Sequence, residues 1–262
     1  MKSISFSAIC YDHFPEKNKS VPGGNSLNFA VQIRRLGLSS AVAGFIGTDP
    51  AASQIEALCF REGIDTRLMF RIEGNTASNK LYNTDDGERY AREGDWQNGV
   101  KDDGWFDDKA WQYILTHDLI ATTCNDQHLD ELTRRKSTNN LVSVDFMHLY
   151  SGELLSKYLS KIDIAFLSPV AGIPWEIEDL SGIFQKPVVI MLGAEGSLTF
   201  FQGKKFVQKA YKVEKVTDTT GCGDAYHAGF CYALLNGGTI QDAMKLGTET
   251  ATKVLKGVGG TF

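Results

Sequence analysis

Short apolar segments alternate with segments of helical periodicity along most of the chain, and this alternation constrains the fold more than any other feature. The apolar segments lie at residues 4–10, 41–46, 118–122, 141–146, 162–167 and 188–192. Helical stretches lie between most of them, for example at 26–36 and 50–62. Strands that alternate with helices indicate a mostly parallel sheet with helices on both faces. The sequence therefore predicts a single α/β domain over residues 1–262.

Residues 65–95 interrupt this alternation with short segments in which apolar and polar residues alternate. Turn signals at Gly74-Asn75 and at Asp85-Asp86-Gly87 separate these segments. An Asp-Gly pair between alternating segments is typical of a β-hairpin. One face of the segments is polar, which favours an antiparallel layer outside a parallel core. We therefore expect a small β lid formed by residues 11–22 and 65–95.

The composition excludes several classes of protein. The chain has 262 residues, a net charge of −5 and five scattered cysteines without a C-x-x-C pair. A nucleic-acid-binding surface is usually basic, so the acidic balance argues against one. Scattered cysteines favour free thiols in the cytoplasm over a disulfide framework or a zinc site. The first ten residues lack the apolar core of a secretion signal, and we expect no membrane span.

A glycine-rich turn directly precedes the apolar run at 225–235. The run has helical spacing, so Gly221, Cys222 and Gly223 are expected at the helix N-terminus. Unpaired N–H groups and the positive end of the helix dipole favour an anion there. Asp224 is then a candidate general base, and the alternative is an acid that only caps the helix. An anion site beside a base is what phosphoryl transfer to a hydroxyl requires.

Two better-known nucleotide-binding motifs do not fit this turn. A P-loop requires the pattern G-x-x-x-x-G-K-[ST], which the chain lacks. A dinucleotide fingerprint requires G-x-G-x-x-G, and Gly221, Gly223 and Gly229 are spaced differently. The spacing therefore argues against a nicotinamide-dependent enzyme.

A second glycine pair, Gly23-Gly24, is followed by Asn25 and Asn28. Paired glycines let a ligand approach the backbone, and asparagine both donates and accepts hydrogen bonds, which suits sugar hydroxyls. The alternative is a turn with an asparagine helix cap. Asp12 follows the first predicted strand, at the edge where α/β proteins bind ligands. We expect it to accept hydrogen bonds from vicinal hydroxyls, and the alternative is a solvated loop acid.

These stretches together resemble one enzyme family. The segment Asp218-Thr-Thr-Gly-Cys-Gly-Asp224 resembles the carboxy-terminal signature D-T-T-G-A-G-D of the ribokinase/PfkB carbohydrate kinases, with Cys222 in place of alanine. The segment from Gly23 to Asn28 resembles the amino-terminal half of the same family. Gly193 and Gly196 resemble its nucleotide-side loop. The resemblance implies a ribokinase-like fold and ATP-dependent phosphorylation of a sugar, with Mg²⁺ bridging the phosphates.

The resemblance also implies roles for individual residues. Asp224 is the base, and the N–H groups of Gly221, Cys222 and Gly223 hold the γ-phosphoryl group. An aspartate with an ordinary pKa of about 3.9 is ionised at pH 7 without special tuning. The expected sugar-binding residues are Asp12, Gly23, Gly24, Asn25, Asn28 and Arg92. The expected nucleotide-binding residues are Gly193, Gly196, Thr219, Gly221 and Gly223. A monovalent cation, K⁺, is expected near Asp218 and Thr220.

The chain departs from the family where magnesium is usually organised. The family often has N-x-x-E after a central strand, and here that region reads Ser168-Pro-Val-Ala171, with Glu176 and Glu178 farther on. The segment Asp145-Phe-Met-His148 lacks the frequent D-x-N. We therefore assign no magnesium ligand.

Within the family, the front of the chain is similar to fructoselysine 6-kinases. The shared pattern is Pro15-x-x-Asn-Lys19-x-x-x-Gly-Gly-Asn25. The similarity implies phosphorylation of the 6-hydroxyl of fructoselysine or a related fructosamine. Charged side chains of the predicted lid could bind the amino-acid part of such a substrate. The alternative is that they form a solvated strand end. These charges are Arg89, Arg92, Glu93 and Asp95.

The same motifs are also compatible with other functions. The substrate could instead be fructose, another hexose or a nucleoside, because specificity depends on the lid and a few loop residues. A sugar or nucleotide sensor without catalysis is a further alternative, and the presence of Asp224 argues against it. Relatives often bury the lid against a second copy, so we expect a homodimer.

Overall fold

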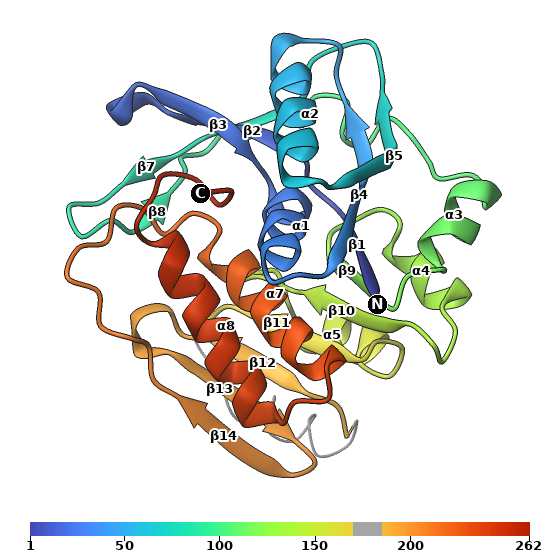
Figure 1. The fold of residues 1–262 in the computed structure, drawn as a ribbon, viewed down its shortest axis with the longest axis vertical. Helices are drawn as coiled ribbons and strands as arrows, with labels where there is room; N and C mark the ends of the chain where they lie inside the picture. Colours follow the sequence, from blue (N-terminus) through green and yellow to red (C-terminus); the bar gives the residue numbers. More distant parts are fainter. Residues whose placement is uncertain (170–184) are drawn as a thin grey trace.

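The computed structural model describes residues 1–169 and 185–262, and a nine-stranded sheet lies at its centre (Figure 1). Its strands are β1 (Lys2–Phe6), β4 (Ser39–Ile46), β5 (Asp65–Arg71), β9 (Leu119–Thr123), β10 (Leu141–Asp145), β11 (Ile164–Leu167), β12 (Val188–Met191), β13 (Ser197–Phe201) and β14 (Lys204–Gln208). Their order is β14-β13-β12-β11-β10-β9-β1-β4-β5. All neighbours from β12 to β5 are parallel, and only β13 is reversed, because it pairs antiparallel with both β12 and β14. The predicted mostly parallel sheet is confirmed.

Helices cover both faces of this sheet (Figure 1). They are α1 (Asn25–Arg35), α2 (Pro50–Glu62), α3 (Asp108–Ile114), α4 (Leu129–Arg135), α5 (Gly152–Tyr158), α7 (Cys222–Leu235) and α8 (Ile240–Val254), with short 3-10 turns η1 (Pro15–Lys17) and η2 (Gly193–Glu195). Apolar side chains of α1, α7 and α8 share one core cluster, and those of α3, α4 and α5 share another. The helices therefore form two layers around a central sheet.

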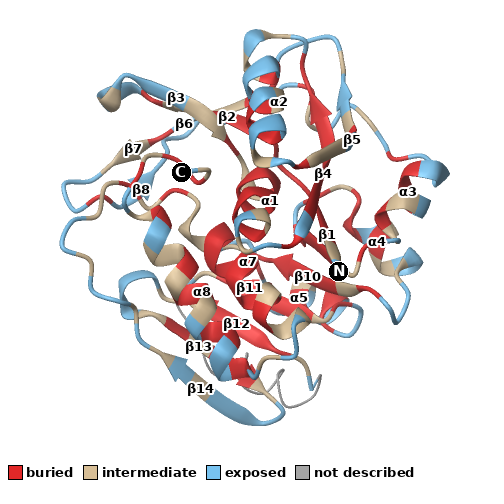
Figure 2. Ribbon diagram, in the orientation of Figure 1, coloured by how far each residue is buried: buried red, intermediate tan, exposed pale blue. Residues whose placement is uncertain are grey.

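Alternate residues of the central strands enter the two cores. In β11, Ile164 and Phe166 belong to the core with α7, whereas Ala165 and Leu167 belong to the core with α5. A strand buried on both faces reads as a continuous apolar run, which explains why these strands were predictable. Figure 2 shows the resulting band of buried residues through the sheet and the inner helices.

Helix α7 is held close to α8 by a glycine. A Cβ on Gly229 would lie 2.7 Å from the carbonyl oxygen of Leu246, so only glycine permits this crossing. Phe230 of α7 and Met244 of α8 are fully buried beside it. This packing fixes the position of α7, whose first turn carries the glycine-rich motif.

A small three-stranded sheet forms the lid, and a two-stranded hairpin extends it (Figure 1). The lid strands are β2 (Cys10–Phe14), β3 (Lys19–Gly23) and β6 (Ala77–Lys80), and the hairpin strands are β7 (Tyr82–Asn83) and β8 (Arg89–Tyr90). The order is β3-β2-β6, with β2 antiparallel to β3 and parallel to β6. A small lid sheet is therefore present, but it is mixed rather than purely antiparallel.

Two boundaries differ from the sequence prediction. Residues 65–71 were expected in the lid, but they form β5, which pairs with β4 at the edge of the central sheet. Of these residues only Leu68 is buried, because an edge strand is covered on few sides. The predicted strand 4–10 also divides, since β1 ends at Phe6 and Cys10 begins β2.

Within residues 1–169 and 185–262, no helix is both long enough and apolar enough to cross a membrane. All five cysteines lie in these ranges and are free thiols. Four of the thiols are buried, and Cys222 is half-buried.

Candidate active site

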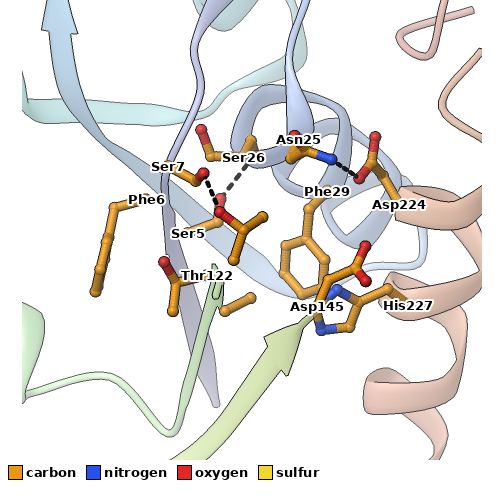
Figure 3. Close-up of a pocket in the computed structure, with 12 residues that line it drawn as sticks. Ser5, Phe6, Ser7, Asn25, Ser26, Phe29, Thr122, Asp145, Asp224 and His227 are labelled. Carbon is orange, nitrogen blue, oxygen red and sulfur yellow. Dashed lines mark hydrogen bonds between the residues drawn. The ribbon is translucent and has the colours of Figure 1, made fainter. Parts of the chain in front are cut away.

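Asp224 lies in the first turn of α7, and two asparagines of α1 hold its carboxylate. Figure 3 shows one of them, Asn25, bonded to Asp224. Nδ2 of Asn25 donates to Oδ1 at 3.0 Å, and Nδ2 of Asn28 donates to Oδ2 at 2.8 Å. The asparagines expected to bind sugar hydroxyls thus fix the orientation of the candidate base. Each carboxylate oxygen has a second lone pair, so Asp224 can still accept a proton.

Burial changes the proton affinity of Asp224. Loss of solvent raises its pKa to about 6, and the hydrogen bonds from Asn28 and Asn25, together with the charge of Arg89, oppose this rise. The expectation of an ordinary aspartate pKa is therefore wrong, because the carboxyl group is buried rather than solvated. The group is still mostly ionised at pH 7, and it is a stronger base than an ordinary aspartate.

The glycine-rich turn requires its glycines. Gly221 is the N-cap of α7 with a φ of 78°, and a Cβ there would lie 2.2 Å from Cα of Gly260. The N–H of Cys222 already donates to the carbonyl of Thr219 at 3.2 Å. The N–H groups of Gly221 and Gly223 are therefore better placed than that of Cys222 to bind an anion.

The thiol of Cys222, the residue that replaces the usual alanine of the motif, is unreactive. Burial, with the nearby charge of Asp218, raises the pKa of its thiol to about 12, so the thiol is neutral at pH 7. The Sγ atom donates a long hydrogen bond to the carbonyl of Ala251 at 3.8 Å. Cysteine at this position therefore fills space beside α8 and is not a nucleophile.

Asp12 lies inside lid strand β2, whereas the sequence analysis placed it just after the first strand. It is 4% exposed, and Sγ of Cys10 donates to its Oδ1 at 3.3 Å. A Cβ on Gly23 would lie 2.0 Å from Oδ2, so this glycine makes room for the carboxylate. Burial raises the pKa of Asp12 to about 7, and the charge of Asp224 adds to the rise. The two acids are therefore close enough to repel each other, and the solvated-loop alternative is wrong because Asp12 is buried.

Two buried amide oxygens near these acids have no hydrogen-bond partner in the described part of the chain. They are Oδ1 of Asn28 and Oδ1 of Asn79. Asn79 lies on β6 opposite Asp12. A buried acceptor without a donor is costly, so these atoms suit a ligand that carries hydroxyl groups. Asn79 was not predicted, because a single asparagine in a short polar strand has no motif around it.

Asp218 is satisfied by neighbouring protein groups. Its Oδ1 accepts from the N–H of Thr220 (3.1 Å), the hydroxyl of Thr220 (2.8 Å) and Nδ2 of Asn83 (2.8 Å). Its Oδ2 accepts from the N–H of Gly259 at 2.8 Å. Oδ1 has no free lone pair, whereas Oδ2 accepts one hydrogen bond and keeps a second lone pair. A K⁺ ion near Asp218 and Thr220 stays a prediction, and no step is derived through it.

The end of the lid rests on the loop that precedes α7. The N–H of Arg89 donates to Oγ1 of Thr219 at 2.8 Å, and the N–H of Thr219 donates to the carbonyl of Gly87 at 3.2 Å. Nζ of Lys17 donates to the carbonyl of Thr217 at 2.8 Å and to Oδ1 of Asn83 at 2.5 Å. The sequence analysis missed these contacts.

The lid arginines differ in their surroundings. The guanidinium of Arg92 stacks 4.0 Å above the ring centre of Tyr82. The charge of Arg89 instead lowers the pKa of both Asp12 and Asp224. Arg89, rather than the predicted Arg92, therefore acts electrostatically on the acids of the site.

The predicted nucleotide-side loop lies near the start of α7. A Cβ on Gly223 would lie 3.7 Å from Cε of Met191, which precedes Gly193 by two residues. Gly196 has a φ of 104°, and a Cβ there would lie 2.0 Å from the carbonyl oxygen of Gln208. Gly196 is thus required by the β13–β14 hairpin itself, whatever its role toward ATP.

The residues of the ranges 1–169 and 185–262 form no metal-binding cluster of side chains. No group of three or more His, Cys, Asp or Glu side chains there could hold an ion. Ser168 and Pro169 end the first range, while Val170, Ala171, Glu176 and Glu178 lie outside the described residues. In kinases Mg²⁺ is usually held by substrate phosphates and water with one or two carboxylates, and no residue of this chain is assigned to it.

A mostly parallel sheet covered on both faces, a glycine-rich turn at a helix N-terminus and a buried carboxylate beside a small lid are together the arrangement expected of a sugar kinase. The chain belongs to the pfkB family of carbohydrate kinases, whose model matches residues 4–262. Curated relatives agree with this membership, and solved structures share the fold.

Among the relatives is a fructoselysine 6-kinase of Shigella flexneri, 26% identical over 254 residues with 94% of each chain covered. Another is the fructosamine kinase FrlD of Bacillus subtilis, 26% identical over 269 residues, with 100% of this chain and 93% of the relative covered. The structure of Arabidopsis thaliana ribokinase complexed with ribose and ATP has a TM-score of 0.81 at 17% identity, over 99% of this chain and 94% of the ribokinase.

Proposed function

We propose that the protein transfers the γ-phosphoryl group of ATP to the 6-hydroxyl of a ketosugar, and that the sugar is fructoselysine or a related fructosamine. The observation that carries this proposal is the buried carboxylate of Asp224, held by Asn25 and Asn28 beside the N-terminus of α7. The names of the relatives and the similar front of the chain support the choice of sugar.

In the proposed reaction, Asp224 accepts the proton of the 6-hydroxyl while the sugar oxygen attacks the γ-phosphorus. The N–H groups of Gly221 and Gly223 donate to the γ-phosphoryl oxygens, where charge develops in the transition state. The proton can leave late in a loose transition state, so a base with a pKa of about 6 is sufficient. Mg²⁺, when bound with ATP, supplies charge neutralisation on the phosphates.

The sugar lies between the lid and α1 in this proposal. Asp12 accepts hydrogen bonds from ring hydroxyls, and the unpaired oxygens of Asn28 and Asn79 accept others. Gly23 leaves room for the carboxylate of Asp12, and Gly24 leaves room for the carbonyl of Ala8, so the two glycines let the lid pack close to the start of α1. The amino-acid part extends toward the charged end of the lid, where Arg89 can pair with its carboxylate.

We also propose that two copies associate through their lids. The lid sheet has an open edge at β3, whereas backbone bonds to Asp95 and Gln97 cover the edge of β6. Small sheets with an open edge commonly pair. Light scattering at micromolar concentration would detect the dimer.

The change Asp224→Asn tests the chemistry. We expect the variant to fold and to bind ATP, because the amide keeps the shape of the side chain. Turnover should fall about 10²–10⁴-fold, which is the usual effect of losing a positioned base. In the parent protein, kcat should decline below about pH 6, where the buried Asp224 becomes protonated.

Steady-state ADP release, with circular dichroism as the folding control, measures both effects. Turnover close to the parent's in folded Asp224→Asn protein would refute the assignment of the base.

A further inference from the structure

A second buried acid shares a cavity with Asp224. Asp145 ends β10 and is 5% exposed. It lines a cavity of about 10 Å³ together with Asp224, His227 and Thr122. Figure 3 shows both carboxylates among the side chains around this cavity. The proposed reaction uses Asp224 and leaves Asp145 without a role, although burying an acid that accepts one backbone hydrogen bond and has no cationic partner is costly for the fold.

The cavity suits one water molecule. A volume of about 10 Å³ is close to the minimum for a water site. A buried water needs two to four polar partners, and Thr122 offers a buried hydroxyl that has no partner among the described residues. The carboxylates of Asp145 and Asp224 complete such a set, so one water can connect the two acids.

The charged neighbours of Asp145 do not neutralise it. On α7 it faces Asp224 and His227, and His227 is neutral because burial lowers its pKa to about 3. After β9 it faces Cys124, whose thiol stays protonated because burial raises its pKa to about 12. Cavity residues from β1 and α1, namely Ser5, Phe6, Ser7, Asn25, Ser26 and Phe29, carry no charge. The strongest charge acting on Asp145 is thus that of Asp224.

We propose that Asp145 is a positioning residue that takes up, through the cavity, the proton that Asp224 removes from the sugar. This inference rests on the proposed kinase reaction. The hydroxyl proton passes to Asp224 and then to Asp145, and the O–H electron pair forms the new bond to phosphorus. The bond from phosphorus to ADP breaks, and Asp145 releases the proton to solvent after the products leave.

The proton affinities of the two acids support this direction. Burial raises the pKa of Asp145 to about 7, the N–H of Met147 opposes the rise, and the charge of Asp224 adds to it. The pKa of Asp224 is about 6. Asp145 therefore holds a proton at least as readily as Asp224, so it can take up the proton that Asp224 removes.

The change Asp145→Asn tests the proposal, because the amide oxygen can still accept the N–H of Met147, which now donates to Oδ1 at 2.7 Å. The readout is the pH profile of kcat at saturating sugar, where bound hydroxyls keep Asp12 ionised. The parent should show two ionisations, near pH 6 and near pH 7. The variant should keep only the lower one and lose up to about tenfold in kcat at pH 8.

The exposed acid Asp108 provides the matched control, and Asp108→Asn should keep both ionisations. A purely structural role for Asp145 would lower kcat equally at all pH values. Two ionisations in Asp145→Asn, or an unchanged kcat at pH 8, would overturn the proposal. Asp224→Asn, assayed in the same experiment, separates this proposal from the proposed function. If Asp224→Asn is inactive, an overturning result for Asp145→Asn refutes only the role of Asp145. If Asp224→Asn is active, the proposed kinase chemistry itself is refuted.

A second measurement avoids any change at Asp145, in case the amide variant does not fold. Carboxyl ¹³C NMR can follow the aspartates of the Asp224→Asn protein. Asp145 should titrate at lower pH than in the parent, because the neighbouring negative charge is gone. Equal titration of Asp145 in the two proteins would contradict the coupling.

Discussion

Asp12 shows how one residue depends on the lid that carries it. A carboxylate at this position would be an ordinary solvated acid if residues 10–14 formed a loop. Pairing of β2 with β3 and β6 buries it, and Gly23 leaves it the space. A buried carboxylate with free lone pairs is a strong acceptor for hydroxyl groups.

The change Asp12→Ala should therefore act on sugar binding. Hydrogen bonds to a charged group contribute about 1.5–3 kcal/mol each, so the affinity for sugar should fall about 10- to 100-fold. The affinity for ATP should change little. Calorimetry with each ligand measures this, and Asp86→Ala is a matched control, since Asp86 is an exposed lid acid bonded to Thr84. A loss of ATP affinity without loss of sugar affinity would place Asp12 on the nucleotide side.

At the scale of elements, the lid and the start of α7 form one unit. The hairpin β7–β8 lies against the loop 216–219, and Asn83 links the two by donating to buried Asp218. Asp218 in turn binds Thr220, next to the turn that is expected to hold the phosphoryl group. We therefore expect the position of the lid to be coupled to the geometry of the glycine-rich turn.

The change Asn83→Ala should weaken this coupling. It removes the donor to Asp218 and the acceptor of Lys17. Loss of a hydrogen bond to a charged group costs about 1.5–3 kcal/mol, so kcat/KM for the sugar should fall roughly tenfold or more. The control Asn98→Ala removes an exposed asparagine bonded to Asp102 and should behave as the parent. Equal kinetics of the two variants would show that the lid contact does not matter for turnover.

Elements differ in how well the sequence predicts them. The helix at 50–62 and the turn at 221–224 depend on local signals, such as a Pro start and paired glycines, and both were predicted correctly. The strand at 65–71 was wrongly placed in the lid, because an exposed edge strand and a lid strand both alternate polar and apolar residues. Only pairing with β4 distinguishes an edge strand of the central sheet from a lid strand, and strand pairing depends on residues that are far apart in the sequence.

The site shows the same limit. The sequence motifs pointed to Asp224, Asn25 and Asn28, although not to the hydrogen bonds that join them. The contact of Asn83 with Asp218 spans 135 positions of the chain and has no motif. The raised pKa values of the buried acids could not be predicted either, because burial depends on the complete fold.

At the scale of the whole molecule, the lid is the part least supported by the core. It is a three-stranded sheet whose outer strand β3 has exposed residues at its start. Such a sheet gains stability from a partner.

We therefore predict that light scattering at micromolar concentration gives twice the mass of one 28.9 kDa chain. An active monomer under these conditions would contradict pairing through the lid. Dilution of the enzyme during an activity assay gives an independent check, because loss of the partner should loosen the lid.

The central claim is that the protein phosphorylates a ketosugar joined to an amino acid. The most direct measurement is kcat/KM for fructoselysine and for free fructose with ATP on one preparation, with a nucleoside as a third substrate. The account predicts that fructoselysine exceeds fructose by at least about tenfold, since an ion pair with the lid adds to the contacts of the sugar. A ratio near one, or a preference for free fructose or the nucleoside, would contradict it.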